Sequence, residues 1–167
     1  MKSIEETSKH IEIVKSLVGE SISSLSNCQY HFNGKVQYED FGDLEILTTS
    51  GLEICFKLLT DGESVGAYKG KLNIPSSFEV AKGETASWER LLVKQSSAIS
   101  GEKIVSIYAL YDYWPKQNPK TLAGWRVNIS NGEFFVFFNN GDNAIFLFNK
   151  LPPEDDFPDI EKICEQI

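Results

Sequence analysis

Apolar positions near the N-terminus recur with the spacing of an amphipathic helix. Ser3 and Glu6 form an S-x-x-E capping box, which marks where such a helix begins. The apolar residues that return to one face of this helix are Ile4, Ile11, Val14, Leu17 and Val18. A second, shorter helix is predicted over 85–95, with Thr85 or Ser87 as its N-cap. Its apolar face consists of Trp88, Leu91 and Leu92.

After each helix the pattern changes to strands joined by hairpins. Strands are predicted over about 20–31 and 102–113. Each is followed by a loop and then by a hairpin whose turn is Ser-Gly at 50–51 or Asn-Gly at 131–132. Asn-Gly between apolar runs is a strong hairpin signal, because both residues tolerate a positive φ. A second turn, TDGE in the first half and NNGD in the second, returns the chain into a further strand.

The two halves of the chain also resemble each other in sequence. LVGESISSL at 17–25 aligns with ISGEKIVSI at 99–107, and DLEILTTSGLEICF at 43–56 aligns with GWRVNISNGEFFVF at 124–137. A single gap keeps both blocks in register, which predicts an internal duplication. The alternative is that two unrelated hairpins look alike.

Together these patterns predict an α+β protein made of two helix-plus-antiparallel-sheet repeats that pack pseudo-symmetrically, with a short C-terminal helix. The first repeat is expected over 1–70, a connection over 71–84 and the second repeat over 85–150. Residues 151–167 are expected to form an acidic loop and the terminal helix. The whole chain is expected to be one compact domain.

Phenylalanine is concentrated in the last hairpin, NGEFFVFFNNGDNAIFLFN. The strand at 133–138 and the return strand at 144–148 are apolar on both faces, which predicts central strands covered on two sides. The residues expected in the core are Phe135, Phe137 and Phe146. The equivalent strand of the first half, LEICFKLL, alternates apolar and polar residues, so it is expected to be covered on one side only.

The 167 residues carry a net charge of −8, from 16 basic and 24 acidic residues, and this charge is unevenly distributed. Residues 17–70 hold 3 basic and 8 acidic side chains, residues 99–150 hold 5 and 4, and residues 151–167 hold 1 and 6. An acidic chain argues against nucleic acid, whose binders need a basic stripe, and against an anionic membrane surface. The polar N-terminus and the lack of a long apolar run predict a cytoplasmic protein with no membrane span.

Few residues offer catalytic or metal-binding chemistry. His10 and His31 are the only histidines, and the three cysteines show no zinc-type spacing, so they are expected to be free thiols. Cys28 and His31 lie three residues apart on a predicted strand and should point to opposite faces, which argues against a nucleophile and its base. We therefore expect a non-enzymatic protein with no cofactor and no metal. A glycosidase-type pair of carboxylates remains open, because sequence spacing does not reveal one.

Candidate partner-binding residues fall into three groups. An acidic loop contributes Glu39, Asp40, Asp43 and Glu45, and an acidic tail contributes Glu154, Asp155 and Asp156. An aromatic loop contributes Tyr111, Tyr113 and Trp114. Tyrosine and tryptophan are enriched at interface hot spots, and acidic clusters attract basic partners. The alternatives are that the acidic residues only confer solubility and that the aromatic residues cover the core.

The segments GDLEILTTSGLEICF and GWRVNISNGEFFVFFNNGD each place a glycine and a short strand before a Ser-Gly or Asn-Gly turn and another strand. In this pattern, and in size, acidity and β-rich layout, the chain resembles the immunity proteins of bacterial polymorphic-toxin systems. The resemblance implies toxin neutralisation by occlusion of an active site or substrate surface, and it carries over no site residues. The predicted function is thus binding of a basic protein partner, such as a toxin domain. The alternative is a small-molecule-binding domain with an aromatic-lined pocket between the sheets.

Overall fold

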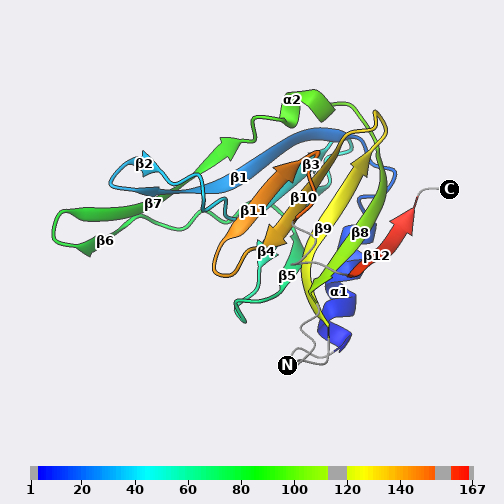
Figure 1. Cartoon of the computed structure of the whole chain (residues 1–167). Coiled ribbons are helices and arrows are strands. Elements are labelled where there is room, and N and C mark those ends of the chain that lie inside the picture. The colour runs from blue at the N-terminus through cyan, green and yellow to red at the C-terminus, as the bar shows by residue number, and fades with distance from the viewer. Residues whose placement is uncertain (1–3, 113–119, 153–158, 166–167) are drawn as a thin grey trace.

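Two antiparallel β-sheets lie face to face in the computed structural model, which describes residues 4–112, 120–152 and 159–165 (Figure 1). The helices described are α1 (Ile4–Lys15) and α2 (Ser96–Ile99). The strands described are β1 (Ile22–Phe32), β2 (Lys35–Val36), β3 (Leu44–Thr48), β4 (Glu53–Leu58), β5 (Val65–Lys69), β6 (Phe78–Ala81), β7 (Glu84–Leu92), β8 (Ile104–Asp112), β9 (Thr121–Ile129), β10 (Phe134–Asn139), β11 (Ala144–Phe148) and β12 (Asp159–Glu165). This arrangement confirms the predicted mixed α+β class with antiparallel sheets. In the described part of the chain, neither helix has the length and apolar character that a membrane crossing requires.

Each sheet is built around a meander of four strands. The first sheet has the order β5-β4-β3-β1-β7-β6, with β2 paired to β1, and the second has the order β11-β10-β9-β8-β12. The helix predicted at the N-terminus and the strands predicted before each loop are confirmed as α1, β1 and β8. The predicted hairpin turns are confirmed as well, since Gly51 and Gly132 have φ values of +88° and +89°. Glycine adopts such a conformation without the steric cost that a Cβ would impose.

The helix predicted over 85–95 is wrong, because most of these residues form β7. Seven consecutive residue pairs register β7 against β1, and Trp88 lies opposite Tyr30 with ring centroids 5.4 Å apart. Leu92, which the helical interpretation placed on a buried face, is 67% exposed. Pairing with β1 satisfies the backbone of this segment and overrides its weak helical period.

The predicted C-terminal helix is also wrong. Residues 159–165 form β12, which pairs antiparallel with β8 at the edge of the second sheet. The open edge of β8 offers backbone hydrogen bonds that a short terminal helix would leave unused. The expected connection over 71–84 likewise contains β6 and the first residue of β7.

Large aromatic side chains fill the space between the two sheets. Phe56 of β4 contacts Trp125 of β9 and Phe137 of β10, with ring centroids 5.9 Å apart in both pairs. Phe135 and Phe137 are fully buried, which confirms both as core residues. Phe146 is half-buried and packs against Phe135 at the rim of this core.

β10 is apolar on both faces, as predicted. Phe135 and Phe137 belong to the core between the sheets, whereas Val136 and Phe138 form a separate buried cluster with Leu110 on the opposite face. The alternation of the strand therefore sorts its apolar residues into two packed layers.

The outer face of the first sheet is covered around Cys55 and Glu45 by residues 70–73, which we call the strap. The Cys55 thiol donates to the carbonyl oxygen of Gly70 at 3.2 Å, and the N–H of Leu72 donates to Oε2 of Glu45 at 2.9 Å. Cys55 is completely buried, and Leu72 packs in the same cluster. The prediction that the strand LEICFKLL is covered on one side only is thus wrong, because the strap, which was expected to be part of a connecting loop, packs against Cys55 of this strand.

The two sheets are joined where β1 and β8 begin. Ser21 and Lys103 form an isolated antiparallel bridge. Around this bridge, four backbone hydrogen bonds of 2.7–2.9 Å connect the segments 19–22 and 101–104. These segments contain the repeated G-E-x-I pattern of the two halves.

Candidate functional site

The loop at 37–43, between β2 and β3, is held in place by two buried amide side chains of β1. Nδ2 of Asn27 donates to the carbonyl oxygen of Phe41 at 2.7 Å, and Nε2 of Gln29 donates to that of Asp40 at 2.9 Å. Both amide side chains belong to residues that are only 4% exposed. These hydrogen bonds replace those that the buried amides would make to water. The backbone of the acidic loop is therefore fixed.

Gly42 determines how this loop enters β3. Its φ is +72°, and a Cβ at this position would lie 2.0 Å from the carbonyl oxygen of Cys28. No other residue type fits so close to a neighbouring backbone without displacing it. Immediately after Gly42, the carbonyl oxygen of Asp43 accepts the N–H of Cys28 at 2.9 Å, which aligns the loop with β1.

Phe41 connects the acidic loop to the second sheet. Its N–H donates to the carbonyl oxygen of Ala144 at 3.3 Å, and its ring stacks on Phe146 with centroids 5.1 Å apart. Together with Tyr38, Glu39 and the β10–β11 turn, this stack lines a cavity of about 300 Å³, which we call the loop hollow. Tyr38 is 82% exposed. The loop hollow therefore combines aromatic rings with a carboxylate at the protein surface.

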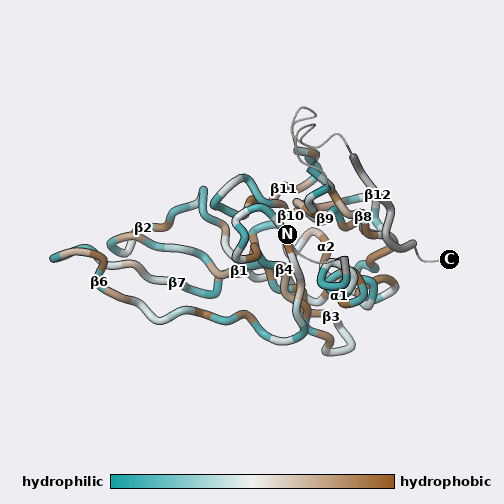
Figure 2. The backbone as a smooth tube through the Cα atoms, turned by 90° about the horizontal axis from the view of Figure 1, so that it is seen from below, coloured by the Kyte–Doolittle hydropathy of each residue, from teal (hydrophilic) through white to brown (hydrophobic). Residues whose placement is uncertain are grey.

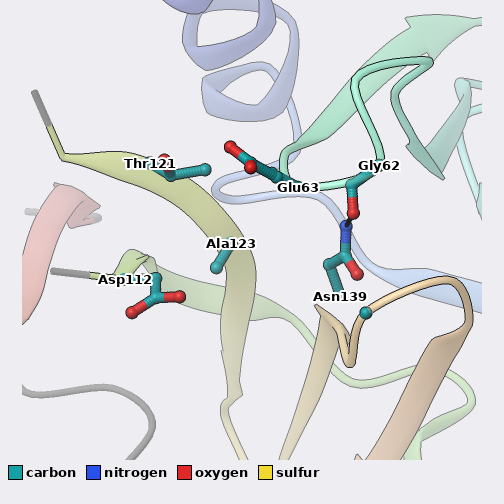
Figure 3. Close-up of a pocket in the computed structure, with 7 residues that line it drawn as sticks. Gly62, Glu63, Asp112, Thr121, Ala123 and Asn139 are labelled. Carbon is teal, nitrogen blue, oxygen red and sulfur yellow. Dashed lines mark hydrogen bonds between the residues drawn. The ribbon is translucent and has the colours of Figure 1, made fainter. Parts of the chain in front are cut away.

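A second cavity, of about 380 Å³, lies where the β4–β5 and β10–β11 turns meet the end of β8 and the start of β9 (Figure 3). Asn139 joins the two turns, because its Nδ2 donates to the carbonyl oxygen of Gly62 at 3.0 Å. Figure 3 shows the side chains of Glu63 and Thr121 pointing toward each other, with Asp112 on the far side of the cavity from Glu63. The described lining residues include two carboxylates and one amide side chain, and none of them is aromatic.

The acidic residues predicted in the loop occupy different environments. Glu39 is exposed, whereas Asp40 and Asp43 are half-buried. Burial raises the pKa of Asp40 above its usual range. Burial also raises the pKa of Asp43 to about 6, and the positive charge of Lys57 opposes this increase. Glu39 is thus the member of this group that reaches a partner most readily.

Glu45 is not available to a partner, which corrects its assignment as a binding residue. It is 1% exposed, and its carboxylate forms an ion pair with Arg90 of β7. Alternation along β3 directs Leu44 and Ile46 into the core and Glu45 to the opposite face. There the strap covers the carboxylate and donates the N–H of Leu72 to it.

The remaining candidates are only partly placed. Tyr111 is half-buried against the core, with Nζ of Lys120 at 5.6 Å from its ring centroid. The candidates outside the residues that the structure describes are Tyr113, Trp114, Glu154, Asp155 and Asp156. Tyr38 and Phe41 are not among the predicted binding residues. The run Y-E-D-F at 38–41, with aromatic residues on both sides of an acidic pair, is the signal that identifies them.

The histidines and the buried thiols have structural roles. The N–H of Ala67 donates to Nδ1 of His10 at 3.2 Å, which fastens α1 to β5. His31 is buried, and its Nδ1 lies 3.1 Å from the carbonyl oxygen of Gln29. Burial, with a smaller effect of nearby carboxylates, raises the pKa of Cys28 to about 11, so this free thiol is a poor nucleophile. Within the described ranges, no group of three or more His, Cys, Asp or Glu side chains is arranged to hold a metal ion.

Replacing Asp43 by asparagine should stabilise the protein at neutral pH. The pKa of Asp43 in the folded state is about 6, above the ordinary value of 3.8. Between these two pH values the folded state therefore retains a proton that the unfolded state has lost. The stabilising contribution of this proton is complete below about pH 4 and is lost as the pH rises through about 6. In urea unfolding, the advantage of Asp43→Asn over wild type should be about 1–2 kcal/mol larger at pH 7.5 than at pH 4.5.

Glu39→Gln is the matched control for Asp43→Asn, because Glu39 lies in the same loop and is exposed. Its effect on the free energy of unfolding should be small at both pH values. An advantage of Asp43→Asn that does not change with pH would contradict the assignment of a raised pKa to this carboxyl group.

No protein-family model, no curated protein and no solved structure matches this chain.

Proposed function

We propose that this protein binds a basic protein partner, without catalysis, through the loop at 37–43 and the loop hollow. The observation that carries the proposal is Tyr38, which is 82% exposed beside the exposed Glu39, on a loop whose backbone is fixed by buried amides. Tyrosine is enriched at interface hot spots, because its ring supplies a large apolar contact area and its hydroxyl group can hydrogen-bond. A fixed loop loses little conformational entropy when it binds, so it favours association.

The negative charge around the loop at 37–43 also favours a basic protein partner. The carboxylates described on the loop at 37–43, on the β4–β5 and β10–β11 turns and at the end of β8 are Glu39, Asp40, Asp43, Asp61, Glu63, Asp112 and Asp142. In a chain with a net charge of −8, such a cluster steers a basic partner toward these loops during diffusion. The rings of Tyr38 and Phe41 then offer a cation–π surface to an arginine or lysine side chain of the partner, and Glu39 offers an ion pair.

This surface is suited to occlusion of another protein, which is the role implied by the resemblance to polymorphic-toxin immunity proteins. We include in the proposal that the partner is a cytoplasmic toxin domain whose basic active site or substrate surface is covered. The support is the chemical complementarity of an acidic, aromatic and fixed surface to a basic one.

Neutralising the carboxylates around the loop hollow should slow association with the partner by about ten-fold or more. The variant combines Glu39→Gln, Asp40→Asn and Asp142→Asn. Dissociation should change much less, because rim charges act mainly on the on-rate. The effect should fade with added salt, as the Debye length falls to about 8 Å at physiological ionic strength. The measurement is association kinetics, at two salt concentrations, with the protein captured by affinity purification from the native host.

The control variant combines Glu5→Gln, Glu12→Gln and Glu84→Gln, which removes the same charge at exposed positions of α1 and at the start of β7. Its association rate should stay within about two-fold of wild type, since a distant charge contributes little to local steering. Equal slowing by both variants would mean that the acidic loop contributes only to net charge. Capture of a partner that binds both variants and wild type alike would contradict the proposed surface.

A second candidate function is binding of a small cationic ligand, favoured by the 380 Å³ cavity with Glu63 and Asp112 in its lining. The aromatic pocket expected between the sheets is occupied by the buried rings of Phe56, Trp125 and Phe137. A small ligand would therefore bind at the end of the sheets instead of between them. Native mass spectrometry of protein purified from its host would show such a ligand as a discrete added mass that Glu63→Gln reduces.

We also propose that the two halves are copies related by a pseudo-two-fold axis near the bridge between Ser21 and Lys103. The backbone hydrogen bonds at this junction come in equivalent pairs under the alignment of the repeated segments. Ile22 N donates to Glu102 O and Ile104 N donates to Glu20 O, while Gly19 N donates to Ile104 O and Gly101 N donates to Ile22 O. Superposition of residues 19–68 on 101–149 tests the proposal, and strands that fail to overlay in order would contradict it.

A further inference from the structure

Part of the first sheet projects away from the two-sheet body as an arm. The arm consists of β2, β6, β7 and the adjoining half of β1, and it extends beyond all other strands in both views (Figures 1 and 2). β6 forms one edge of this sheet, and all four of its residues are exposed. Because an edge strand carries unpaired N–H and C=O groups, β6 presents a template for another strand.

The side chains along this edge are unusually apolar for an exposed strand. Phe78 is 54% exposed and Val80 is 53% exposed. Phe78 contacts Trp88 of β7 with ring centroids 5.7 Å apart, and Trp88 in turn contacts Tyr30 of β1 at 5.4 Å. A row of three aromatic rings therefore crosses the arm and ends at its open edge, where a further strand would extend the packing.

We propose that β6 pairs antiparallel with β6 of a second copy of this chain, about a two-fold axis at Val80. In antiparallel pairing, directly opposed residues share a face of the sheet, so a two-fold axis on Val80 places it opposite Val80 of the second copy. The same register sets Glu79 opposite Ala81, while Phe78 lies opposite Lys82 of the β6–β7 turn, just beyond the end of β6. The register of β6 against β7 shifts at Val80, between Glu79 and Ala81. Shifting the axis to Glu79 would oppose two like charges, which destabilises a strand pair.

The charge of the β6 edge favours a second copy of this chain over the basic partner proposed for the acidic loop. Residues 78–82 contain one acidic and one basic side chain, Glu79 and Lys82, so this edge is neutral in a chain of net charge −8. A neutral, apolar edge gives a basic protein no electrostatic attraction, but it is self-complementary in the Val80 register. The projecting arm also keeps the two acidic bodies apart, which limits their repulsion.

The proposed dimer does not involve the loop hollow. The salt dependence of binding distinguishes the dimer from the complex with a basic partner. Binding of a basic partner should weaken as salt rises, because salt screens attraction between opposite charges. Pairing of two acidic copies through a neutral edge should strengthen as salt rises, because salt screens their repulsion. Sedimentation of the full chain over a range of concentrations and at two salt concentrations should therefore show a dimer that salt stabilises. A monomer at all concentrations would overturn the proposal.

Substitutions at Val80 test the register. Val80→Glu and Val80→Lys should each weaken the dimer by about ten-fold or more, because like charges then face each other at the axis. An equimolar mixture of the two variants should restore dimerisation, because opposite charges face each other in the mixed pair. Leu92→Glu, at an exposed position of β7, is the control and should leave the dimer unchanged. A dimer that survives both Val80 variants, or a mixture that remains monomeric, would overturn pairing at this axis.

Cross-linking gives a second readout that does not depend on charge. Val80→Cys should form a covalent dimer under mild oxidation, whereas Leu92→Cys should not, because only position 80 would face its own copy. Circular dichroism of each variant establishes that the arm substitutions leave the fold intact. Capture of a different protein's strand by β6, with no covalent dimer of Val80→Cys, would also overturn the proposal.

Discussion

Truncating Phe137 to alanine should lower the free energy of unfolding by about 3–5 kcal/mol, as removal of a fully buried aromatic ring does. Phe137 has no exposed surface, and its ring lies 5.9 Å from that of Phe56, which belongs to the facing sheet. The side chain therefore contributes to the contact between the two sheets as well as to its own strand. The sheets are close-packed at this point, so the lost ring would leave a cavity that its neighbours fill only in part.

Urea unfolding of Phe137→Ala beside Phe78→Ala measures this effect against a matched control. Phe78 is the same residue type on an exposed strand, so its truncation should cost less than about 1 kcal/mol. A similar loss for both variants would mean that Phe137 is not enclosed between the sheets. The size of the difference reports how well the two sheets are packed.

Replacing Arg90 by methionine should destabilise the protein by about 2–4 kcal/mol, because it leaves the carboxylate of Glu45 buried without its counter-charge. Glu45 is 1% exposed, whereas the side chain of Arg90 is 47% exposed. The expected loss is set below that of a fully buried pair, since water reaches the arginine side. The N–H of Leu72 in the strap also donates to this carboxylate, but it does not neutralise the charge.

Glu45 is buried and Arg90 is partly exposed, and this difference provides a control. Glu45→Gln removes the buried charge and leaves Arg90 in contact with water, so it should cost less than about 1 kcal/mol. The double variant, Glu45→Gln with Arg90→Met, should recover most of the stability that Arg90→Met loses. Losses that simply add in the double variant would show that the two side chains do not interact.

The Glu45–Arg90 ion pair, together with the strap, also helps to hold β7 of the arm in place. Arg90 lies on β7, Glu45 on β3 and Leu72 in the strap, so one carboxylate ties together three segments that are distant in sequence. Loss of the pair should therefore loosen the strap before it disturbs the aromatic core. The loop hollow is held by different contacts, namely the amides of Asn27 and Gln29, and should remain intact.

Local sequence determined those features that depend on neighbouring residues. Capping and apolar spacing predicted α1, and Ser-Gly and Asn-Gly turns predicted the two hairpins, because a positive φ at glycine is a property of the turn itself. Alternation in β10 predicted that Phe135 and Phe137 share a buried face. Each of these signals is complete within a few residues, so no distant partner is needed to interpret it.

Only the tertiary structure decided what depends on distant partners. Residues 85–95 carry a helical period, but β1 supplies backbone pairing along most of the segment and makes it a strand. The local sequence predicts that Glu45 is an exposed loop carboxylate, but the strap and Arg90 enclose it. Tyr38 and Phe41 become a surface feature because buried amides of β1 fix their loop and because Phe146 comes from the other sheet. Burial and pairing of this kind are properties of the assembled sheets, since the free energy of each contact depends on residues that the local pattern does not contain.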